Sequence, residues 1–475
     1  LKNTVIDEPY ENMPAAEVGL KKGDVILAIG DSSMVGKDVA YVSNHLRGDA
    51  GTTFILTIQR PSVNKKMKFK ITRRSIQLPA VPYYGVQDGG VGYLNLNSFT
   101  TGCAKDVRRA FLDMKKQGMT SLVFDLRNNG GGSLQEAVNI VNMFVPKGIT
   151  LVKTVGKMER ANKEYKTTVE PIDTVMPIVV LVNDETASAS EITSGSLQDL
   201  DRAVVLGTRT YGKGLVQVSM DLPYNGNLKL TTSKYYIPSG RCIQAINYKH
   251  ANGGYTEHVP DSLTHVFHTA NGREVRDGGG IKPDVEVRPD SLPNIAFYLA
   301  SSGRDSTEVM WNWELQYLKK HPTIGPAKTF VISDADFEDF KQAVLKSGFK
   351  YDRESKKYLE NLVKLAKFEG YYDDAKGEFD ALEKKLNHNL AKDLDYNKQT
   401  LKKVLTSDLV SAYYYQKGSL ENSLQFDKQW KKAVEILKNP AEYKKLLQPV
   451  VGQPLVKLEP ASNVAVDKKQ KSKAK

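Results

Sequence analysis

The middle of the chain alternates apolar runs with amphipathic segments, and this alternation is the feature that most restricts how the chain can fold. From about Gly90 to Val287, β-type runs such as VGYLNL, SLVFDL and IVVLVN are separated by helix-type segments such as AKDVRRAFLDMKK and LQEAVNIVNMF. This pattern predicts an α/β core. We expect any chemistry to lie in this core, over residues 75–292.

The residues before the core predict a small β-rich domain over residues 1–74. They contain an apolar strand from Val25 to Ile29, a helical segment near Asp38 to Leu46, and an alternating strand from Phe54 to Ile58.

After about Pro293 the pattern changes to long helical segments rich in lysine and glutamate, such as YDRESKKYLENLVKLAKFEG. They predict a mostly α-helical C-terminal domain over residues 293–461. Residues 462–475 include VDKKQKSKAK, which lacks the apolar side chains needed for packing, so we expect a disordered basic tail there.

Composition excludes several classes of protein. The net charge of the 475 residues is +12, but the lysines gather beside glutamates and aspartates and no aromatic-interleaved basic motif occurs, so nucleic acid is not an expected partner. The two cysteines, Cys103 and Cys242, imply no disulfide framework. No window approaches the ~20 apolar residues of a membrane span, and we expect any export signal to lie outside the sequence shown.

The stretch NDETASASEITSG, residues 183–195, follows an apolar run and places Ser188 where a strand gives way to a helix. Ser188 and Glu191 fit a capping box, and the local string alone favours this structural interpretation. The alternative is a nucleophile, which requires a positioned base.

Two residue types could supply that base. His250, His258, His265 and His268 crowd a polar stretch, but they fit solvent-facing positions better than a base or a zinc site. Lys213 lies between two glycines in TRTYGKGLVQ, just before an apolar strand, and flanking glycines permit the close approach that a base needs. A lysine must be neutral to accept a proton, so a base at this position has to be buried. A solvated turn lysine is the alternative.

A glycine-rich loop, DLRNNGGG at residues 125–132, lies between a predicted strand and a predicted helix. Its backbone amides suit an oxyanion or a phosphate. The Lys-Ser/Thr pair of a phosphate-binding P-loop is missing.

Taken together, these segments resemble the carboxy-terminal processing proteases, or tail-specific proteases, which are serine-lysine endopeptidases with an embedded PDZ domain. TASASEITSGSLQDLDRAVVLGTRTYGKGLVQ resembles the family's nucleophile-to-base segment, and DLRNNGGG resembles its oxyanion loop. GYLNLNSFT, LTTSKYYIPSGRCIQ and GIKPDVEV agree. The resemblance implies a multidomain α/β protein with a partial PDZ-like module, a crotonase-like (ClpP-like) protease core and a helical C-terminal domain.

The resemblance also assigns roles. It makes Ser188 the nucleophile, Lys213 the general base and Gln217 the residue that orients the lysine. The oxyanion donors are then the backbone amides of Ala189 and of Gly130 or Gly131. Asp199 matches a position implicated in the family, which we interpret as structural. No metal or cofactor is expected.

The first domain resembles a PDZ module through PAAEVGLKKGDVILAIG. Its carboxylate-binding loop is expected to lie before Leu1, so we expect weak binding of tail peptides. Arg47, after the groove helix, is a candidate for coupling peptide occupancy to the active site; a helix C-terminal arginine interacting with the helix dipole is the alternative.

The resemblance therefore predicts a serine endopeptidase that cleaves proteins with flexible, apolar, free C-terminal ends. It predicts a periplasmic or cell-envelope location, which allows peripheral association with the membrane or with envelope proteins, and no oligomeric state follows. Two alternatives remain: a catalytically silent PDZ scaffold, and a crotonase-like acyl-thioester enzyme that would not need Lys213.

Overall fold

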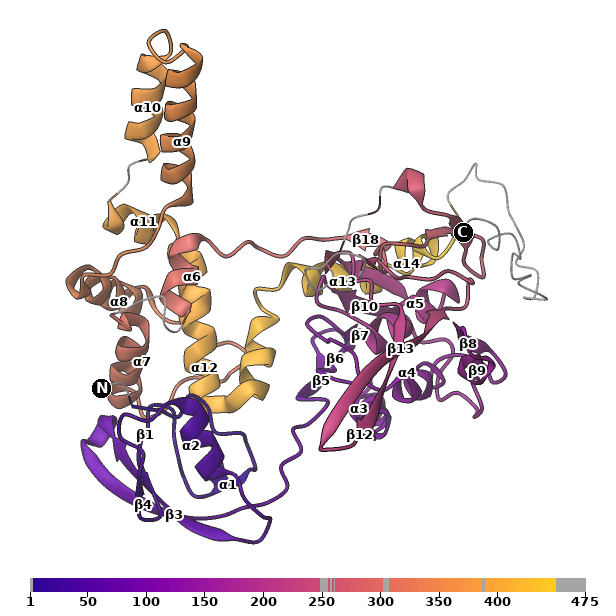
Figure 1. The fold of residues 1–475 in the computed structure, drawn as a ribbon, viewed down its shortest axis with the longest axis horizontal. Helices are drawn as coiled ribbons and strands as arrows, with labels where there is room; N and C mark the ends of the chain where they lie inside the picture. Colours follow the sequence, from indigo (N-terminus) through magenta and orange to yellow (C-terminus); the bar gives the residue numbers. More distant parts are fainter. Residues whose placement is uncertain are drawn as a thin grey trace. The chain divides into compact units, whose positions relative to one another are not determined.

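The structure is a computed structural model that describes residues 3–247, 255–256, 259, 261–301, 307–386 and 389–449. The chain forms two compact units. The first combines residues 1–77 with 290–426, and the second combines residues 78–289 with the segment from Asp427 onward (Figure 1). The helical segment is therefore inserted between two parts of the second unit.

The N-terminal part of the first unit is the expected small β-rich domain. Its elements are α1 (Pro14–Glu17), β1 (Val25–Ile29), β2 (Ser32–Ser33), α2 (Val39–Leu46), β3 (Thr53–Arg60) and β4 (Lys65–Thr72). The strands form an antiparallel sheet in the order β2-β1-β3-β4.

Alternation along these strands explains the core of the β-rich domain. Leu56 and Ile58 on β3 point inward and are buried with Met34 and Val42, whereas the intervening Thr57 is partly exposed. Asp38 caps α2 by accepting a hydrogen bond of 2.7 Å from the backbone N–H of Tyr41.

The rest of the first unit is helical, as expected. Its helices are α6 (Asn294–Ala300), α7 (Val309–Lys320), α8 (Asp334–Ser347), α9 (Glu354–Glu369), α10 (Lys376–Leu386), α11 (Leu390–Tyr396) and α12 (Lys398–Ser423). Their core contains Trp313, Phe337, Phe340, Leu401 and Leu405. Helices α9 and α10 lie side by side as a hairpin (Figure 1).

A buried charged cluster joins the β-rich domain to these helices within the first unit. Lys22 Nζ lies 3.0 Å from Glu314 Oε2 on α7, and Glu314 is also hydrogen-bonded to Asp408 on α12. Burial raises the pKa of Glu314 to about 8; the positive charge of Lys22 opposes this shift, and the negative charge of Asp408 adds to it. Burial likewise raises the pKa of Asp408. One proton shared between the two carboxyl groups accounts for this pair, because two adjacent buried carboxylates cannot both ionise cheaply.

The second unit contains the α/β core. Its elements are β5 (Tyr83–Gln87), β6 (Val91–Asn95), α3 (Cys103–Lys116), β7 (Ser121–Asp125), α4 (Leu134–Val141), β8 (Thr150–Gly156), β9 (Lys163–Lys166), β10 (Ile178–Val182), α5 (Ala189–Asp199), β11 (Val204–Gly207), β12 (Leu215–Leu222), β13 (Gly226–Tyr236), β14 (Ile246–Asn247), β15 (Tyr255–Thr256), β16 (Val266–His268), β17 (Glu274–Arg276), β18 (Val285–Glu286), α13 (Lys428–Lys438) and α14 (Pro440–Leu446).

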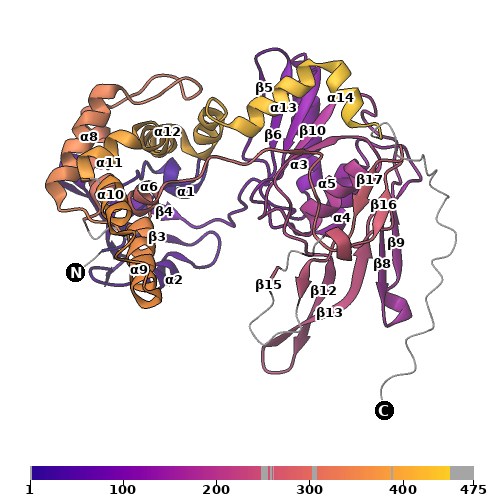
Figure 2. The same cartoon turned by 90° about the horizontal axis from the view of Figure 1, so that it is seen from above.

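The main sheet has the order β18-β11-β10-β7-β6-β5, and all neighbouring pairs are parallel except β5-β6. Every residue of β6, β7, β10 and β11 is buried, which requires cover on both faces. Helices α3, α4 and α5 lie on one side of the sheet, and α13 and α14 lie on the other (Figure 2). Trp430 of α13 packs edge-on against Tyr93 of β6, with ring centroids 5.5 Å apart.

This arrangement differs from the domain division expected from the sequence. Apolar side chains of the amphipathic helix α13, among them Ala433 and Ile436, are fully buried in the second unit. The last two helices therefore pack with the core and not with the helical segment. None of the helices in the described part of the chain is long and apolar enough to cross a lipid bilayer.

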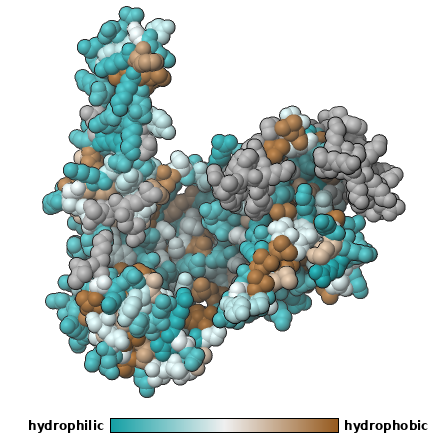
Figure 3. Space-filling model, viewed as in Figure 1, coloured by the Kyte–Doolittle hydropathy of each residue, from teal (hydrophilic) through white to brown (hydrophobic). Residues whose placement is uncertain are grey.

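A second sheet, β12-β13-β8-β9, carries a two-stranded hairpin whose free edge is β12. Val218 pairs with Leu230 and Met220 pairs with Leu228, so these four side chains share one face of the hairpin. All four are more than 40% exposed. In Figure 3, hydrophobic side chains gather over this hairpin.

The buried cluster predicts a specific pH dependence of stability. The folded-state pKa of Glu314, about 8, lies above its ordinary value of 4.5, so the folded protein retains a proton that the unfolded chain has released. The stability from this proton is present below about pH 4.5 and is lost as the pH rises through about 8. We expect Glu314→Gln, which cannot ionise, to gain thermal stability relative to the wild type over this range.

The measurement is the melting temperature of both proteins as a function of pH. Glu378→Gln, at an exposed position on α10, is the matched control and should show a constant offset from the wild type. A constant offset for Glu314→Gln as well would contradict the shared-proton interpretation.

Candidate active site

Ser188 lies at the junction between β10 and α5, as the sequence predicted. It occupies the N-cap position of α5 with φ 57° and ψ −115°, a left-handed backbone conformation that is unusual for a serine. Ser188 and Glu191 form the capping box that the sequence suggests, in which the Glu191 carboxylate accepts from the Ser188 backbone N–H at 2.8 Å. A capping role does not by itself require the positive φ of Ser188. Strained backbone of this kind costs about 1–3 kcal/mol and concentrates at functional sites.

The glycine-rich loop lies directly against this serine. A side-chain carbon on Gly131 would be 2.6 Å from the carbonyl oxygen of Ala187 and 2.8 Å from both the Ser188 Cβ and the Ala189 backbone nitrogen. Gly131 also has φ +93°. Only glycine fits this position without displacing the backbone around Ser188.

Glu191 connects the serine to the lysine. Its fully buried carboxylate accepts hydrogen bonds from the backbone N–H groups of Ser188 (2.8 Å), Gly212 (2.7 Å) and Lys213 (2.8 Å), and from the Thr210 hydroxyl (2.6 Å). Burial raises the pKa of Glu191, whereas these four donors act in the opposite direction. One side chain thus fixes the serine turn and the lysine loop to each other.

Tyr235 on β13 makes a second connection. Its hydroxyl donates to the carbonyl oxygen of Lys213 and lies 3.3 Å from that of Ser188. Lys213 and Ser188 are each half-buried, and within the described part of the chain their side chains are not hydrogen-bonded to each other. Catalytic hydrogen bonds are often long in ligand-free structures and shorten when substrate binds. Gln217, on β12 beyond a β-bulge, is also partly exposed and makes no hydrogen bond to Lys213.

The candidate oxyanion donors differ in whether their N–H groups already donate a hydrogen bond within the protein. The N–H group of Gly131 donates to Asn129 Oδ1 at 2.9 Å. Among the described residues, the N–H groups of Ala189 and Gly130 donate to no protein acceptor. Asn129 is itself fully buried, and its side-chain amide donates to the Leu96 carbonyl oxygen at 2.6 Å.

The other residues singled out in the sequence lie apart from this cluster. Asp199, near the far end of α5, forms a buried ion pair of 2.8 Å with Arg241, as expected for a structural residue. Arg47 is exposed and follows α2 in the first unit. His265 lies 3.0 Å from Asp277, while His250 and His258 lie outside the described residues.

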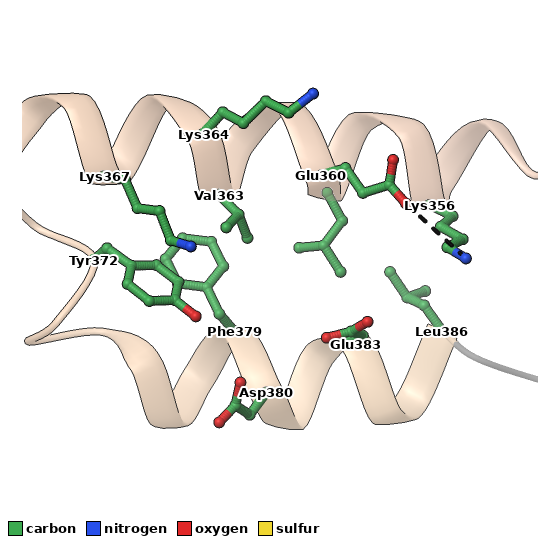
Figure 4. Close-up of a pocket in the computed structure, with 11 residues that line it drawn as sticks. Lys356, Glu360, Val363, Lys364, Lys367, Tyr372, Phe379, Asp380, Glu383 and Leu386 are labelled. Atoms are coloured by element: carbon green, nitrogen blue, oxygen red, sulfur yellow. Dashed lines mark ion pairs between the residues drawn. The ribbon is translucent and has the colours of Figure 1, made fainter.

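A cavity of about 350 Å³ lies between α9 and α10 in the first unit (Figure 4). Tyr372 stacks on Phe379 inside it, Lys367 lies over the Tyr372 ring, and Lys356 pairs with Glu360 at its rim. None of the predicted catalytic residues lines this cavity.

Three family descriptions match successive parts of the chain. Residues 5–60 match "PDZ domain", residues 90–250 match "Peptidase family S41", and residues 298–437 match "Probable PDZ-protease, C-terminal helical domain". The matches indicate an S41-type peptidase core combined with a PDZ domain and a helical region, and the expected fold class is confirmed.

Curated relatives make the assignment more specific. A carboxy-terminal-processing protease of Bartonella bacilliformis is 38% identical over 242 residues, which are 50% of this chain and 55% of that protein. A "Probable CtpA-like serine protease" of Staphylococcus aureus is 31% identical over 366 residues, 76% of this chain and 61% of that protein. The chain therefore spans between one half and two thirds of the length of these relatives. The solved structure of the photosystem II D1 C-terminal processing protease shares 28% identity over 61% of this chain and 70% of its own, with a TM-score of 0.34. The chain is thus similar, over half to three quarters of its length, to carboxy-terminal processing serine proteases.

The sequence pattern indicates only part of the site. It predicts Glu191 as half of a capping box and gives Tyr235 no role. The glutamate three residues after the serine was a usable signal for a local contact, but its bonds to Gly212 and Lys213 span more than 20 residues and depend on the tertiary fold.

The position of Glu191 generates a prediction. Glu191→Gln replaces one acceptor oxygen by an NH₂ group that cannot accept from backbone N–H groups, so at least one donor loses its partner. Each loss costs about 1–3 kcal/mol. We expect a fluorophosphonate reagent to label Ser188 at least about tenfold more slowly in the variant. Glu185→Gln, at an exposed position in the same loop, is the control. Equal labelling rates in folded Glu191→Gln and the wild type would contradict the role of Glu191.

Proposed function

We propose that the protein is a serine endopeptidase in which Ser188 and Lys213 form a catalytic dyad. The observation that carries this proposal is the four-donor carboxylate of Glu191, which holds the serine turn and the lysine loop together. The strained backbone of Ser188 and its contact with the glycine loop support the same assignment.

In the proposed mechanism, Ser188 Oγ attacks the scissile carbonyl carbon while neutral Lys213 Nζ accepts the hydroxyl proton. The N–H group of Ala189 and that of Gly130 or Gly131 stabilise the oxyanion. When the tetrahedral intermediate collapses, the lysine returns the proton to the leaving amine, and an acyl-enzyme remains. Water then attacks the ester with Lys213 as base and releases Ser188. Gln217 orients the lysine ammonium in this scheme.

We further propose that the substrates are proteins with flexible, apolar, free C-terminal ends. The β12 edge begins two residues after Lys213, and an exposed edge strand can add an extended peptide as a further strand. The adjacent apolar face, which includes Val218 and Met220, suits hydrophobic substrate side chains. The PDZ domain recognises the terminal carboxylate, and Arg47 couples its occupancy to the active site.

The family and the bacterial origin of the relatives support a periplasmic or cell-envelope location for this activity, with peripheral association with the membrane or with envelope proteins. Neither alternative, a silent PDZ scaffold or an acyl-thioester enzyme, requires Ser188 and Lys213 for peptide cleavage, whereas the proposed peptidase requires both.

The dyad is tested by cleavage of an unstructured protein, followed by mass spectrometry. We expect Ser188→Ala and Lys213→Arg each to abolish cleavage while the fold survives. Arginine keeps the positive charge but does not deprotonate in proteins, so it cannot replace a lysine base. Lys229→Arg, at an exposed position on β13, should retain activity. Normal cleavage by folded Ser188→Ala would exclude the nucleophile assignment, and normal cleavage by Lys213→Arg would place the base elsewhere.

Tail recognition is tested with one peptide that has an apolar C-terminus, prepared with either a free or an amidated end. Amidation removes the negative charge that a PDZ site binds. In a chain extended at its N-terminus by the carboxylate-binding loop, we expect the amidated peptide to be cleaved with a KM raised at least about tenfold and with a kcat changed much less. The chain that begins at Leu1 should distinguish the two peptides less. Identical kinetics for the two peptides in the extended chain would reject tail recognition without affecting the dyad.

A further inference from the structure

Arg127 lies inside the glycine-rich loop sequence, yet its side chain does not face the serine turn. The guanidinium pairs with Asp125 at the end of β7, donates to Gln429 Oε1 at 2.7 Å, and lies 2.7 Å from Asp427 Oδ2. Asp427 and Gln429 are 300 residues or more away in the sequence, at the start of α13. Arg127 therefore joins the loop after β7 to the last part of the chain.

The start of α13 is itself built around these two residues. The second carboxylate oxygen of Asp427, Oδ1, caps the helix by accepting from the backbone N–H groups of Gln429 (2.8 Å) and Trp430 (3.1 Å). The side-chain amide of Gln429 donates to the Val287 carbonyl oxygen at 2.6 Å.

These contacts lie where the chain enters and leaves the inserted segment. Val287 lies three residues before Asp290, where the chain passes into the first unit, and Asp427 is the first residue after it returns. Both ends of the insertion therefore meet the guanidinium of Arg127 or its direct partner.

Successive residues of the loop are anchored on different elements. Arg127 is held by α13, the backbone N–H of Asn128 donates to Asn183 Oδ1 at 2.9 Å, and Asn129 is held by Leu96. Gly131, two residues later, contacts Ser188. A change at the Arg127 anchor is thus four residues from the contact between the loop and the nucleophile.

The anchor is electrostatically strong. Burial by itself would lower the pKa of Arg127, but the charges of Asp125 and Asp427 outweigh this effect and raise it. The Arg127 side chain is 19% exposed and lies between the Asp125 and Asp427 carboxyl groups, which are themselves 3% and 15% exposed. Breaking a largely buried ion pair is more costly than breaking a surface pair.

We infer that Arg127 is a positioning residue for the oxyanion loop, and that Asp427 and Gln429 of α13 hold it in place, so that the segment after the helical insertion forms part of the support of the active site. The expected effect on kcat rests on the proposed function. The expected effect on the order of the glycine-rich loop does not.

The test uses Asp427→Asn in the full chain. Asparagine keeps the oxygen that caps α13, because Asn and Asp are equally good N-caps, but it places an NH₂ group against Arg127. We expect kcat for peptide cleavage to fall about tenfold with KM within about twofold, as for an interaction that acts in the transition state. We also expect hydrogen exchange at the hydrogen-bonded backbone amides of Asn128, Asn129 and Gly131 to accelerate at least about tenfold.

The matched control is Asn439→Ala, which removes the cap of the next helix, α14, where Asn439 accepts from the Glu442 backbone N–H at 3.2 Å. It should lower the melting temperature, as expected for the loss of a helix cap, while leaving kcat and exchange at residues 128–131 unchanged. A second variant, Gln429→Leu, removes one acceptor of Arg127 without touching the Asp427 carboxylate; we expect a kcat loss of about threefold to fivefold.

The outcomes separate the two ideas. Unchanged exchange at residues 128–131 in both folded variants would overturn the inference, whatever the activity. If wild-type cleavage depends on Ser188 but both variants match it in kcat, the inference is overturned and the proposed function stands. If the wild type does not cleave peptides but loop exchange accelerates in the variants, the proposed function fails and the positioning of the loop is supported.

Discussion

The hydrogen bonds to the buried carboxylate of Glu191 are the interaction on which the candidate site depends. A carboxylate with no access to water is costly unless its lone pairs are satisfied, and here four donors satisfy them. Three of these donors are backbone N–H groups from two separate loops. Because backbone groups cannot rotate away as side chains do, the carboxylate fixes the path of both loops. Ser188 is thereby held in a backbone conformation that an isolated strand-to-helix turn would not adopt.

The main sheet provides the rigid base for these loops. Its central strands are buried on both faces, so the protein needs helices on both sides. Helices α3 to α5 cover one face, and the chain returns from its helical insertion to cover the other with α13 and α14 (Figure 2). The return has a second effect, since the start of α13 supplies Asp427 and Gln429 to Arg127. The same helix completes the core and contacts Arg127 of the loop beside Ser188.

In the first unit, buried charged side chains likewise connect separate parts of the fold. Lys22 of the PDZ domain is paired with Glu314, which shares a proton with Asp408, and these acids come from two helices of the insertion. Burial acts to lower the pKa of Lys22, but the neighbouring carboxyl groups outweigh this and raise it. Buried charged groups have stricter packing requirements than apolar side chains, so this cluster limits how the PDZ domain packs on the helices within the first unit.

The sequence by itself determined the local elements and the chemical identity of the candidate residues. The strand Val25–Ile29, the strand before the glycine loop and the helix after Ser188 were all predicted, because hydrophobic periodicity and capping residues act over a few neighbouring positions. The motif resemblance pointed to a protease family and to Ser188 and Lys213 as candidate residues. It could not show that they are brought together.

Only the tertiary structure decided how these residues are connected. Glu191, Tyr235 and Arg127 each have a partner that lies at least 22 residues away, and hydrogen bonds over such separations leave no periodic signal in a single sequence. The return of α13 and α14 to the core was undetermined for the same reason. An amphipathic helix shows that it has an apolar face to bury, but the choice of surface that buries it depends on which part of the fold is left uncovered.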